Sequence, residues 1–226
     1  MIVTIDGSAG SGKSEAAKRL AERLGFHILN TGGMYRAVGL FLARARIDVF
    51  VEPRDAERIA KLLENCTFSM DGHRVYLNGH DVTDLIFTAE MGTVASRVAT
   101  FPEVRTPLKA EQRRIASTGD FVCEGRDQGT SVFPNAEVKF FLAASAEVRA
   151  DRRVAQLQSN GEAAERDAIL AQIRARDEQD TKRALDPLAK AADAIEIDTS
   201  ILSLDDVVQR LWDAVRQYRS KAAPGG

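Results

Sequence analysis

The segment GSAGSGKS occupies positions 7–14, directly after the apolar run of residues 2–5. It fits the pattern G-x-x-x-x-G-K-[ST], in which small residues let backbone N–H groups turn inward around phosphate oxygens. Lys13 adds a point charge, and the Ser14 hydroxyl suits Mg²⁺. A plain glycine turn is disfavoured because a helical pattern follows the loop and would add its positive end. The residues predicted to bind a nucleotide phosphate are Gly7, Ser8, Ala9, Gly10, Ser11, Gly12, Lys13 and Ser14.

Arginines indicate a second phosphate site. They stand beside other polar groups in NTGGMYR (30–36), RVATFPEVR (97–105), CEGRDQGT (123–130) and RARDEQDTKR (174–183). Arg36 and Arg126 each follow a glycine-containing turn after an apolar run, which is where parallel α/β sheets bind ligands. A single arginine is more often a solvated surface residue. Two of them here, with planar guanidinium groups that suit phosphate, predict an anion held beside the loop.

The elements that must position these residues are short apolar runs alternating with helical patterns, which predicts a parallel sheet flanked by helices. The expected strands are residues 2–5, 26–29, 121–123, 138–143 and 194–197. Helices are expected from the loop to Gly25, over residues 34–44, and after Ser203, which suits a helix cap. Residues 145–183 predict two helices joined near residues 159–161.

Residues 67–83 break this alternation. The dipeptides Asp71-Gly72 and Asn78-Gly79 are tight-turn signals between strand-like segments, so this stretch predicts a small antiparallel insertion. The tail KAAPGG, residues 221–226, is expected to be disordered.

Composition excludes several classes of protein. The 226 residues are 44% apolar and carry a net charge of −2, which gives no basic field for nucleic acid or an anionic membrane. No window approaches the roughly 18 consecutive apolar residues of a membrane span, and the N-terminus lacks the charged start of a signal peptide. Cys66 and Cys123 fit reduced thiols, so we expect a cytoplasmic protein. From the charge and the lack of a long apolar window we expect no nucleic-acid or membrane partner. The sequence contains neither D-x-x-G nor N-K-x-D, which argues against a GTPase switch.

Four longer segments together resemble the bacterial cytidylate kinases of the nucleoside monophosphate kinase group. They read NTGGMYRAV, GHDVTDLIFTAEMGTVASRVATFPEVR, EGRDQGTSVFPNAEVKFFLAAS and RDEQDTKRALDPL, and the resemblance runs from residue 2 to about 215. It implies an α/β, three-layer P-loop fold with a five-stranded parallel sheet, a small antiparallel monophosphate-binding insert and a helical lid. The implied single domain, 1–220, has its core at about 1–45, 117–150 and 190–220, the insert at 46–100, the lid at 150–183 and a tail at 221–226.

The resemblance also assigns roles at matching positions. The implied monophosphate set is Arg36, Arg126 and Arg183 with Thr31 nearby, the sugar set is Tyr35, Arg176 and Asp180, and the base set is Ser96, Arg105 and Asp127. The exocyclic amine of cytosine needs an acceptor, whereas uracil would leave Asp127 without a donor. The implied catalytic residues are Lys13, Arg126 and Arg183.

The implied reaction moves the γ-phosphoryl of ATP to CMP or dCMP in a monomeric enzyme that uses Mg²⁺. Ser14 would bind the metal and Glu124 would order a water on it, with a structural carboxylate as the alternative for Glu124. The lid carries Arg149, Arg152 and Arg153, and Arg153 is assigned to ATP. A solvated basic helix face is the alternative for each of these arginines.

Simpler roles stay open for several side chains. Ser96 could be a helix-face hydroxyl, and Tyr35 could fill the edge of the core. Asp127 could pair with the arginine before it, and Asp180 with the arginine four residues earlier on a helix.

The sequence departs from the family at Glu15, Gln128 and Gly33, where threonine, methionine and alanine are usual. The Glu15 carboxylate could favour the helix dipole, repel phosphate or point away. Two competing functions stay open: another P-loop kinase acting on UMP or a non-nucleotide acceptor, and a nucleotide-binding regulatory module without transfer. Glu15 is the only sequence support for the second.

Overall fold

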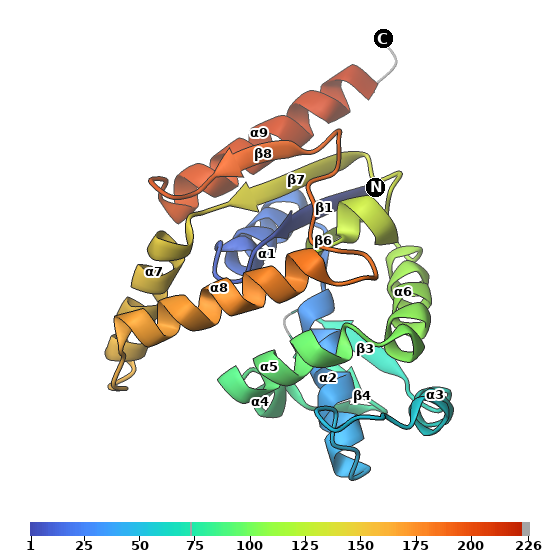
Figure 1. Ribbon diagram of the computed structural model, residues 1–226. Helices are drawn as coiled ribbons and strands as arrows, with labels where there is room; N and C mark the ends of the chain where they lie inside the picture. The colour runs from blue at the N-terminus through green and yellow to red at the C-terminus, as the bar shows by residue number, and fades with distance from the viewer. Residues whose placement is uncertain (73, 223–226) are drawn as a thin grey trace.

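The central sheet carries the site, and the computed structural model describes it within residues 1–72 and 74–222. In this described part, five parallel strands run in the order β2-β6-β1-β7-β8 (Figure 1). Their bounds are β1 Ile2–Gly7, β2 His27–Asn30, β6 Phe121–Gly125, β7 Val138–Ala143 and β8 Ile195–Asp198. The predicted α/β class and its parallel sheet are confirmed.

Two strands begin one residue later than the sequence predicts. Gly25 adopts a left-handed φ of 69°, and the Phe26 N–H donates to the carbonyl of Ala21 at 2.9 Å. Phe26 therefore closes the preceding helix and cannot open β2. The Ala194 N–H likewise donates to the Ala191 carbonyl in a turn, so β8 starts at Ile195.

Helices surround the sheet. They are α1 Lys13–Leu24, α2 Thr31–Arg44, α3 Ala56–Leu63, α4 Thr83–Ile86, α5 Ala89–Val98, α6 Pro102–Ala116, α7 Ala146–Ser159, α8 Arg166–Lys182 and α9 Leu204–Ala222, with a π-helical turn, η1, at Gln128–Val132. Helix α2 begins three residues before the predicted start, because the Asn30 side chain caps it by accepting the Gly33 N–H at 2.9 Å. The predicted cap of the last helix is confirmed, since the Ser203 hydroxyl accepts the Asp206 N–H at 3.2 Å. Residues 223–226 of the expected tail lie outside the described residues.

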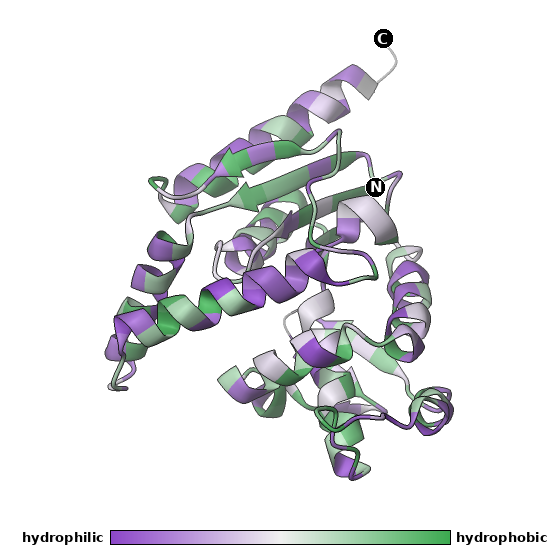
Figure 2. Ribbon diagram, in the orientation of Figure 1, coloured by the Kyte–Doolittle hydropathy of each residue, from purple (hydrophilic) through white to green (hydrophobic). Residues whose placement is uncertain are grey.

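Two apolar clusters cover the two faces of the sheet and make the predicted three layers. On one face, α1 and α9 pack over β1 and β7 through residues such as Leu20 and Leu211, both fully buried. On the other face, α2, α5 and α6 pack with β2 and β6 around residues such as Met34 and Phe101. In Figure 2, β7 is mainly green, whereas the second half of α8 is purple and hydrophilic. No helix in the described part of the chain combines the length and the apolar character needed to span a membrane.

The antiparallel insertion lies beside the main sheet. It contains β3 Phe68–Asp71, β4 Arg74–Leu77 and β5 His80–Asp81 in the order β3-β4-β5. The predicted turn at Asn78-Gly79 is confirmed by positive φ values of 51° and 77°. The insertion packs on α2, where Val75 lies against Gly33. The predicted helix pair is also present, as α7 and α8, which contact each other along their lengths (Figure 1).

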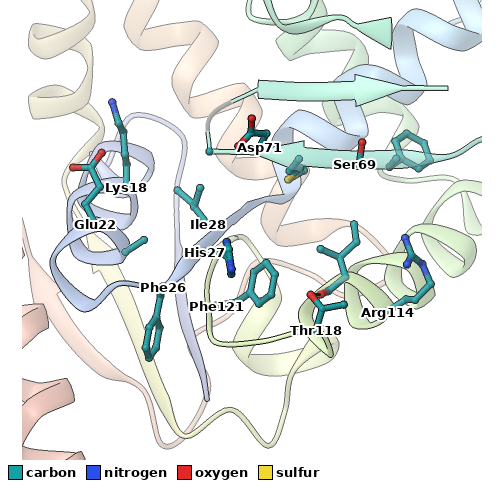
Figure 3. A pocket seen from close by; sticks show the side chains of 15 residues that line it. Lys18, Glu22, Phe26, His27, Ile28, Ser69, Asp71, Arg114, Thr118 and Phe121 are labelled. Atoms are coloured by element: carbon teal, nitrogen blue, oxygen red, sulfur yellow. Dashed lines mark hydrogen bonds between the residues drawn. The ribbon is translucent and has the colours of Figure 1, made fainter. Parts of the chain in front are cut away.

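A pocket of about 500 Å³ opens between edge strand β2, strand β3 and α6. Figure 3 shows His27 and Phe121 at its base and Ser69 and Asp71 on its β3 side. All of the predicted site residues are described in the structure, and none of them lines this pocket. The site therefore has to be found from side-chain geometry at the other end of the strands.

Packing of α2 against α5 gives a test of the fold. A Cβ on Gly39 would lie 2.4 Å from Cγ1 of Val94 and 3.1 Å from Cε of Met91. Gly39→Ala should therefore lower the free energy of unfolding by about 1–3 kcal/mol through overpacking, although alanine favours a helix by about 1 kcal/mol. Denaturant unfolding measures the change.

The matched control is Gly32→Ala in the same helix, where a Cβ meets only Asn30 Oδ1, at 3.4 Å. This variant should be as stable as the parent or more so. Equal stability of the two variants would contradict the close packing of α2 on α5.

Candidate functional site

Strand register brings the predicted site residues to one edge of the sheet. In β1, Ile5 and Asp6 pair with Glu124 and Gly125 of β6. In β2, Asn30 pairs with Glu124 as well. Because the three strands are parallel and end together, the phosphate loop, the turn after β6 and the start of α2 meet at one point.

The phosphate loop joins β1 to α1 and closes around Lys13. Gly12 has a left-handed φ of 85° at the helix start. A Cβ on Gly7 would lie 2.3 Å from the carbonyl oxygen of Leu142. Only glycine fits at both positions, which explains the spacing of the motif. The Lys13 side chain is buried, and its Nζ donates to the Ser8 carbonyl across the loop at 3.1 Å.

Burial, together with the nearby charge of Arg126, lowers the pKa of Lys13 to about 7. A buried ammonium held by one carbonyl is poorly compensated. An anion at this loop would supply the missing charge, so the loop is electrostatically suited to phosphate.

Three arginines gather beside Lys13, and with it we call them the cation cluster: Lys13, Arg36, Arg126 and Arg176. Burial and then Arg126 lower the pKa of Arg176 to about 10, and the same two causes lower the pKa of Arg36. A Cβ on Gly92 would lie 3.1 Å from Arg36 Nη2 and 3.6 Å from Arg176 Nη1, so both guanidinium groups reach α5 at this residue. The buried Nε of Arg176 has no hydrogen-bond partner. The cluster is a concentration of like charge that requires an anion.

Carboxylates hold part of this cluster in place. Arg126 Nε donates to Asp180 Oδ2 at 2.9 Å, and Ser96 Oγ lies 3.4 Å from the other oxygen of Asp180. Burial alone would raise the pKa of Asp180, but Arg126 overrides it and keeps this pKa below the usual value. The hydrogen-bonded arginine partner of Asp180 is therefore Arg126. The alternative, an ion pair with Arg176 on its own helix, is wrong.

The base set lies around a buried ion pair. Arg105 Nη2 donates to Asp127 Oδ2, and both side chains are almost completely buried. The ring of Tyr35 lies 5.7 Å from Arg105 Cζ, and Tyr35 belongs to the apolar core, as the simpler of its two predicted roles expects. Its role in the sugar set stays a prediction. Asp127 pairs with Arg105 and not with Arg126 beside it in the chain. That alternative is wrong.

Arg183 lies with the base set in this structure. Its Nη2 is 3.3 Å from Asp127 Oδ1 without hydrogen-bond geometry, and its Nε donates to the Asp186 carbonyl at 2.6 Å. The roles that the resemblance implies, Arg183 on the phosphate and Arg176 on the sugar, stay predictions. The positions of the two side chains follow from chain geometry, because α8 ends at Lys182 and Arg183 turns into extended backbone, whereas Arg176 faces α5 from within the helix.

Ser14 and Glu124 form an oxygen pair at the loop. Ser14 Oγ donates to Glu124 Oε1 at 3.0 Å, and Thr31 Oγ1 donates to the Glu124 carbonyl at 2.8 Å. Glu124 is buried. A hydroxyl and a carboxylate beside a phosphate site fit Mg²⁺, which prefers oxygen ligands and keeps several waters. The described residues contain no group of three or more His, Cys, Asp or Glu that could cage a metal alone.

The arginines of the helix pair have different partners. Arg149 is buried, pairs with Asp177 and donates to the Ala9 carbonyl of the loop at 3.1 Å. Arg152 donates to the carbonyl and the hydroxyl of Thr199. Arg153 donates to Gln156 Oε1 at 2.8 Å, and its charge contributes to the lowered pKa of Arg36. Arg153 is thus the one whose charge acts on the cation cluster.

Glu15 points away from the phosphate loop. Its Oε1 accepts from Arg19 Nε at 3.0 Å, and Arg19 also pairs with Asp205 at 2.7 Å. Of the three orientations considered from the sequence, the carboxylate takes the one directed along the outside of α1. No repulsion of nucleotide phosphate by Glu15 follows from this geometry.

Sequence reasoning missed Asp6. Its buried carboxylate accepts the N–H groups of Gln128 and Gly129 at 2.9 and 2.7 Å, and so fixes the turn that carries Arg126. Burial raises the pKa of Asp6 to about 7. A polar residue at the carboxyl end of a strand buried on both faces is the signal that could have found it.

Comparison with known proteins gives one family. The family model described as cytidylate kinase matches residues 3–217. The chain is 46% identical to a cytidylate kinase of Fervidobacterium nodosum, over 95% of this chain and 96% of that protein. It is 42% identical to one of Pseudomonas fluorescens, over 95% and 94%. It is 45% identical to one of Mycolicibacterium paratuberculosis, over 99% and 98%.

The lowered pKa of Lys13 generates a prediction about proton uptake. At pH 8 the free protein holds Lys13 mostly neutral, because this pH lies above its pKa of about 7. A bound phosphate favours the charged form and raises that pKa, so ADP binding should take up as much as about one proton at pH 8. At pH 6 Lys13 is already charged, and uptake should be much smaller. Calorimetry of ADP binding in buffers of different ionisation enthalpy measures the uptake.

The control is Lys13→Met, which removes the titrating group and should abolish the difference between pH 8 and pH 6. Equal uptake by the variant and the parent at pH 8 would assign the proton to another group or to the nucleotide.

Proposed function

The chain belongs to the cytidylate kinase family, and from this premise we propose that it transfers the γ-phosphoryl group of ATP to CMP or dCMP. The products are ADP and CDP or dCDP. The observation that carries the proposal is the cation cluster, because it continues the phosphate loop into a second buried anion site. Two adjoining sites of this kind suit two phosphate compounds that exchange a phosphoryl group.

The phosphate loop is proposed to hold ATP. Backbone N–H groups of the loop and the Lys13 ammonium would bind the β- and γ-phosphates, and the Lys13 contact with the Ser8 carbonyl would be exchanged for phosphate. Ser14 and water on Glu124 would hold Mg²⁺, which neutralises phosphate charge when bound. Arg153 would add a contact to ATP from the helix pair.

Arginines of the cation cluster are proposed to hold the acceptor phosphate. Arg36 and Arg126 would direct one oxygen of the CMP phosphate at the γ-phosphorus, with Thr31 beside them. A new oxygen–phosphorus bond forms there while the bond between the γ-phosphorus and the β–γ bridging oxygen breaks, and ADP leaves with the electron pair. Arg126 and Lys13 would stabilise the charge that moves between them. Arg176 would contact the sugar, as the family resemblance implies, and its place in the cation cluster would also bring its charge near the acceptor phosphate.

The base set is proposed to select cytosine. Asp127 would accept from the exocyclic amine, while Ser96 and Arg105 would donate to the ring nitrogen and carbonyl. Asp180, which accepts from Ser96, and Tyr35 would contact the sugar. Uracil presents a carbonyl in place of the amine and would leave Asp127 facing another acceptor. We also propose that residues 46–100 act as the monophosphate-binding part and α7–α8 as the lid, in a monomeric, cytoplasmic enzyme.

The alternative of a regulatory module without transfer loses its support, because Glu15 pairs with Arg19 outside the loop. A panel of nucleoside monophosphates tests whether UMP is an acceptor. With ATP and Mg²⁺, coupled ADP release should give kcat/KM values for CMP and dCMP about 10²-fold above those for UMP, AMP and GMP. Equal rates with UMP and CMP would contradict base selection by Asp127, and tight ATP binding without transfer to any monophosphate would contradict the kinase function.

The role of Arg183 is tested by Arg183→Ala. Its guanidinium is buried with Asp127 and carries an unpartnered Nη2, so its removal should reduce turnover with CMP by about 10²-fold. ATP affinity should change by less than about twofold, since Arg183 makes no contact with the loop. Steady-state kinetics and ATP titration give the two values.

Arg114→Ala is the control, because this exposed arginine pairs only with Glu111 on the outside of α6. It should turn over as the parent does. Normal turnover of Arg183→Ala would remove Arg183 from the reaction.

A further inference from the structure

Asp186 collects an unusual number of donors in the segment between α8 and β8. Its carboxylate accepts from Arg105 Nε at 3.0 Å, from Lys109 Nζ at 3.1 and 3.2 Å, and from Ser131 Oγ at 2.5 Å. Its own carbonyl accepts from Arg183 Nε at 2.6 Å. The donors come from α6, from η1 and from the end of α8, so one residue ties together three elements of the base set.

The backbone of Asp186 is strained in a way that this network explains. Its φ is 46°, in the left-handed region that residues other than glycine seldom adopt. Such a conformation persists where the surroundings over-determine it, and it often marks a functional site. Here it directs the carboxylate toward Arg105 and the carbonyl toward Arg183 at the same time.

The ion pairs around Asp127 show why a second carboxylate is needed. Arg105 and Arg183 both approach Asp127, which must also accept from the base. Both oxygens of Asp127 already have a cationic neighbour, Arg105 at Oδ2 and Arg183 at Oδ1. Asp186 adds a second carboxylate beside Arg105 and Lys109, so Asp127 does not have to compensate these cations alone. Asp186 takes Nε of Arg105 with its carboxylate and Nε of Arg183 with its carbonyl, and Arg105 Nη1 donates to the Ala99 carbonyl at 3.2 Å. These contacts fix the orientation of both guanidinium groups beside Asp127.

We propose that Asp186 is a positioning residue for base selection: it holds Arg105 through its carboxylate and Arg183 through its carbonyl, on either side of Asp127. The inference rests on the proposed function and deepens it. Asp186 touches no reacting group. It acts through the two arginines. Because Arg183 follows directly after α8, Asp186 also connects the end of α8 to the base set. Any movement of the proposed lid would therefore reach Arg105 through Asp186.

Ionisation of Asp186 is secure over the range of an assay. Burial alone would raise its pKa, but Ser131, Lys109 and Arg105 together lower it to about 2. The carboxylate is therefore charged at any pH above about 4, and its effect on selection should not vary with pH between 6 and 9.

The test compares Asp186→Asn and Asp186→Gly with the parent. Both residues tolerate a left-handed φ, so the Arg183 contact to the carbonyl is kept while the charge or the whole side chain is removed. Asp186→Asn should raise KM for CMP about tenfold, as expected for the loss of a charged hydrogen bond, and should lower the preference for CMP over UMP. Asp186→Gly should do so more strongly. KM for ATP should stay within about twofold of the parent.

The control is Asp193→Asn, because Asp193 also pairs with a lysine, Lys139, at 2.8 Å, outside the base set. Its kinetics should match the parent. Two results would overturn the inference: variants of Asp186 with a lower melting temperature but unchanged KM for CMP and unchanged CMP preference, which indicate a purely structural residue, and variants identical to the parent in all measurements. The parent's own activity with CMP tests the proposed function separately. If the parent prefers another monophosphate, the same ratios are taken for that acceptor.

Discussion

Burial of like charge at one sheet edge is the constraint on which the site depends. Burial, and then the charge of Arg126, lowers the pKa values of Lys13, Arg36 and Arg176, so the four cations of the cluster lie close together. A protein interior does not tolerate such a group without compensation. Asp180 compensates part of it through Arg126. Glu124 and Asp177 also act on it, but burial and mutual repulsion still leave these pKa values lowered, so bound phosphate groups would gain affinity and alignment from the cluster.

The sheet makes this arrangement possible because it fixes where three chain segments end. The parallel register of β1, β6 and β2 aligns Asp6, Gly125 and Asn30 at neighbouring strand ends. Asp6 then accepts hydrogen bonds from two N–H groups of the turn after β6, and these bonds fix the conformation of that turn. The apolar layers on both faces hold the strands, and the polar edge follows from them. The phosphate loop is thus one part of a larger arrangement that also includes the buried carboxylate of Asp6, directly before the loop.

Much of this could be predicted from sequence because local signals agree with the fold. The phosphate-loop motif, the alternation of strands with helices and the Asn78-Gly79 turn are local patterns, and the structure contains them. Strand and helix starts were missed where a cap decides them, at Phe26 and Asn30, since capping depends on hydrogen bonds that periodicity does not show. The partners of Asp127 and Asp180 could not be predicted, because both pair across the fold in preference to nearby arginines. Asp186 gave no signal at all, since its importance arises from donors on three distant elements.

Charge also governs how the two halves of the cleft approach each other. Arg36 lies on α2 beside the insertion, whereas Arg153 and Arg176 lie on the helix pair. After burial and Arg126, the charge of Arg153 lowers the pKa of Arg36 and the charge of Arg176 lowers the pKa of Lys13. With the helix pair acting as the proposed lid, repulsion between these cations would oppose closure, and bound phosphates would reverse its sign. Closure excludes water, which strengthens each remaining contact and limits transfer of the phosphoryl group to water. We propose that the like-charge contact that favours anion binding also favours closure of the helix pair once both anions are bound.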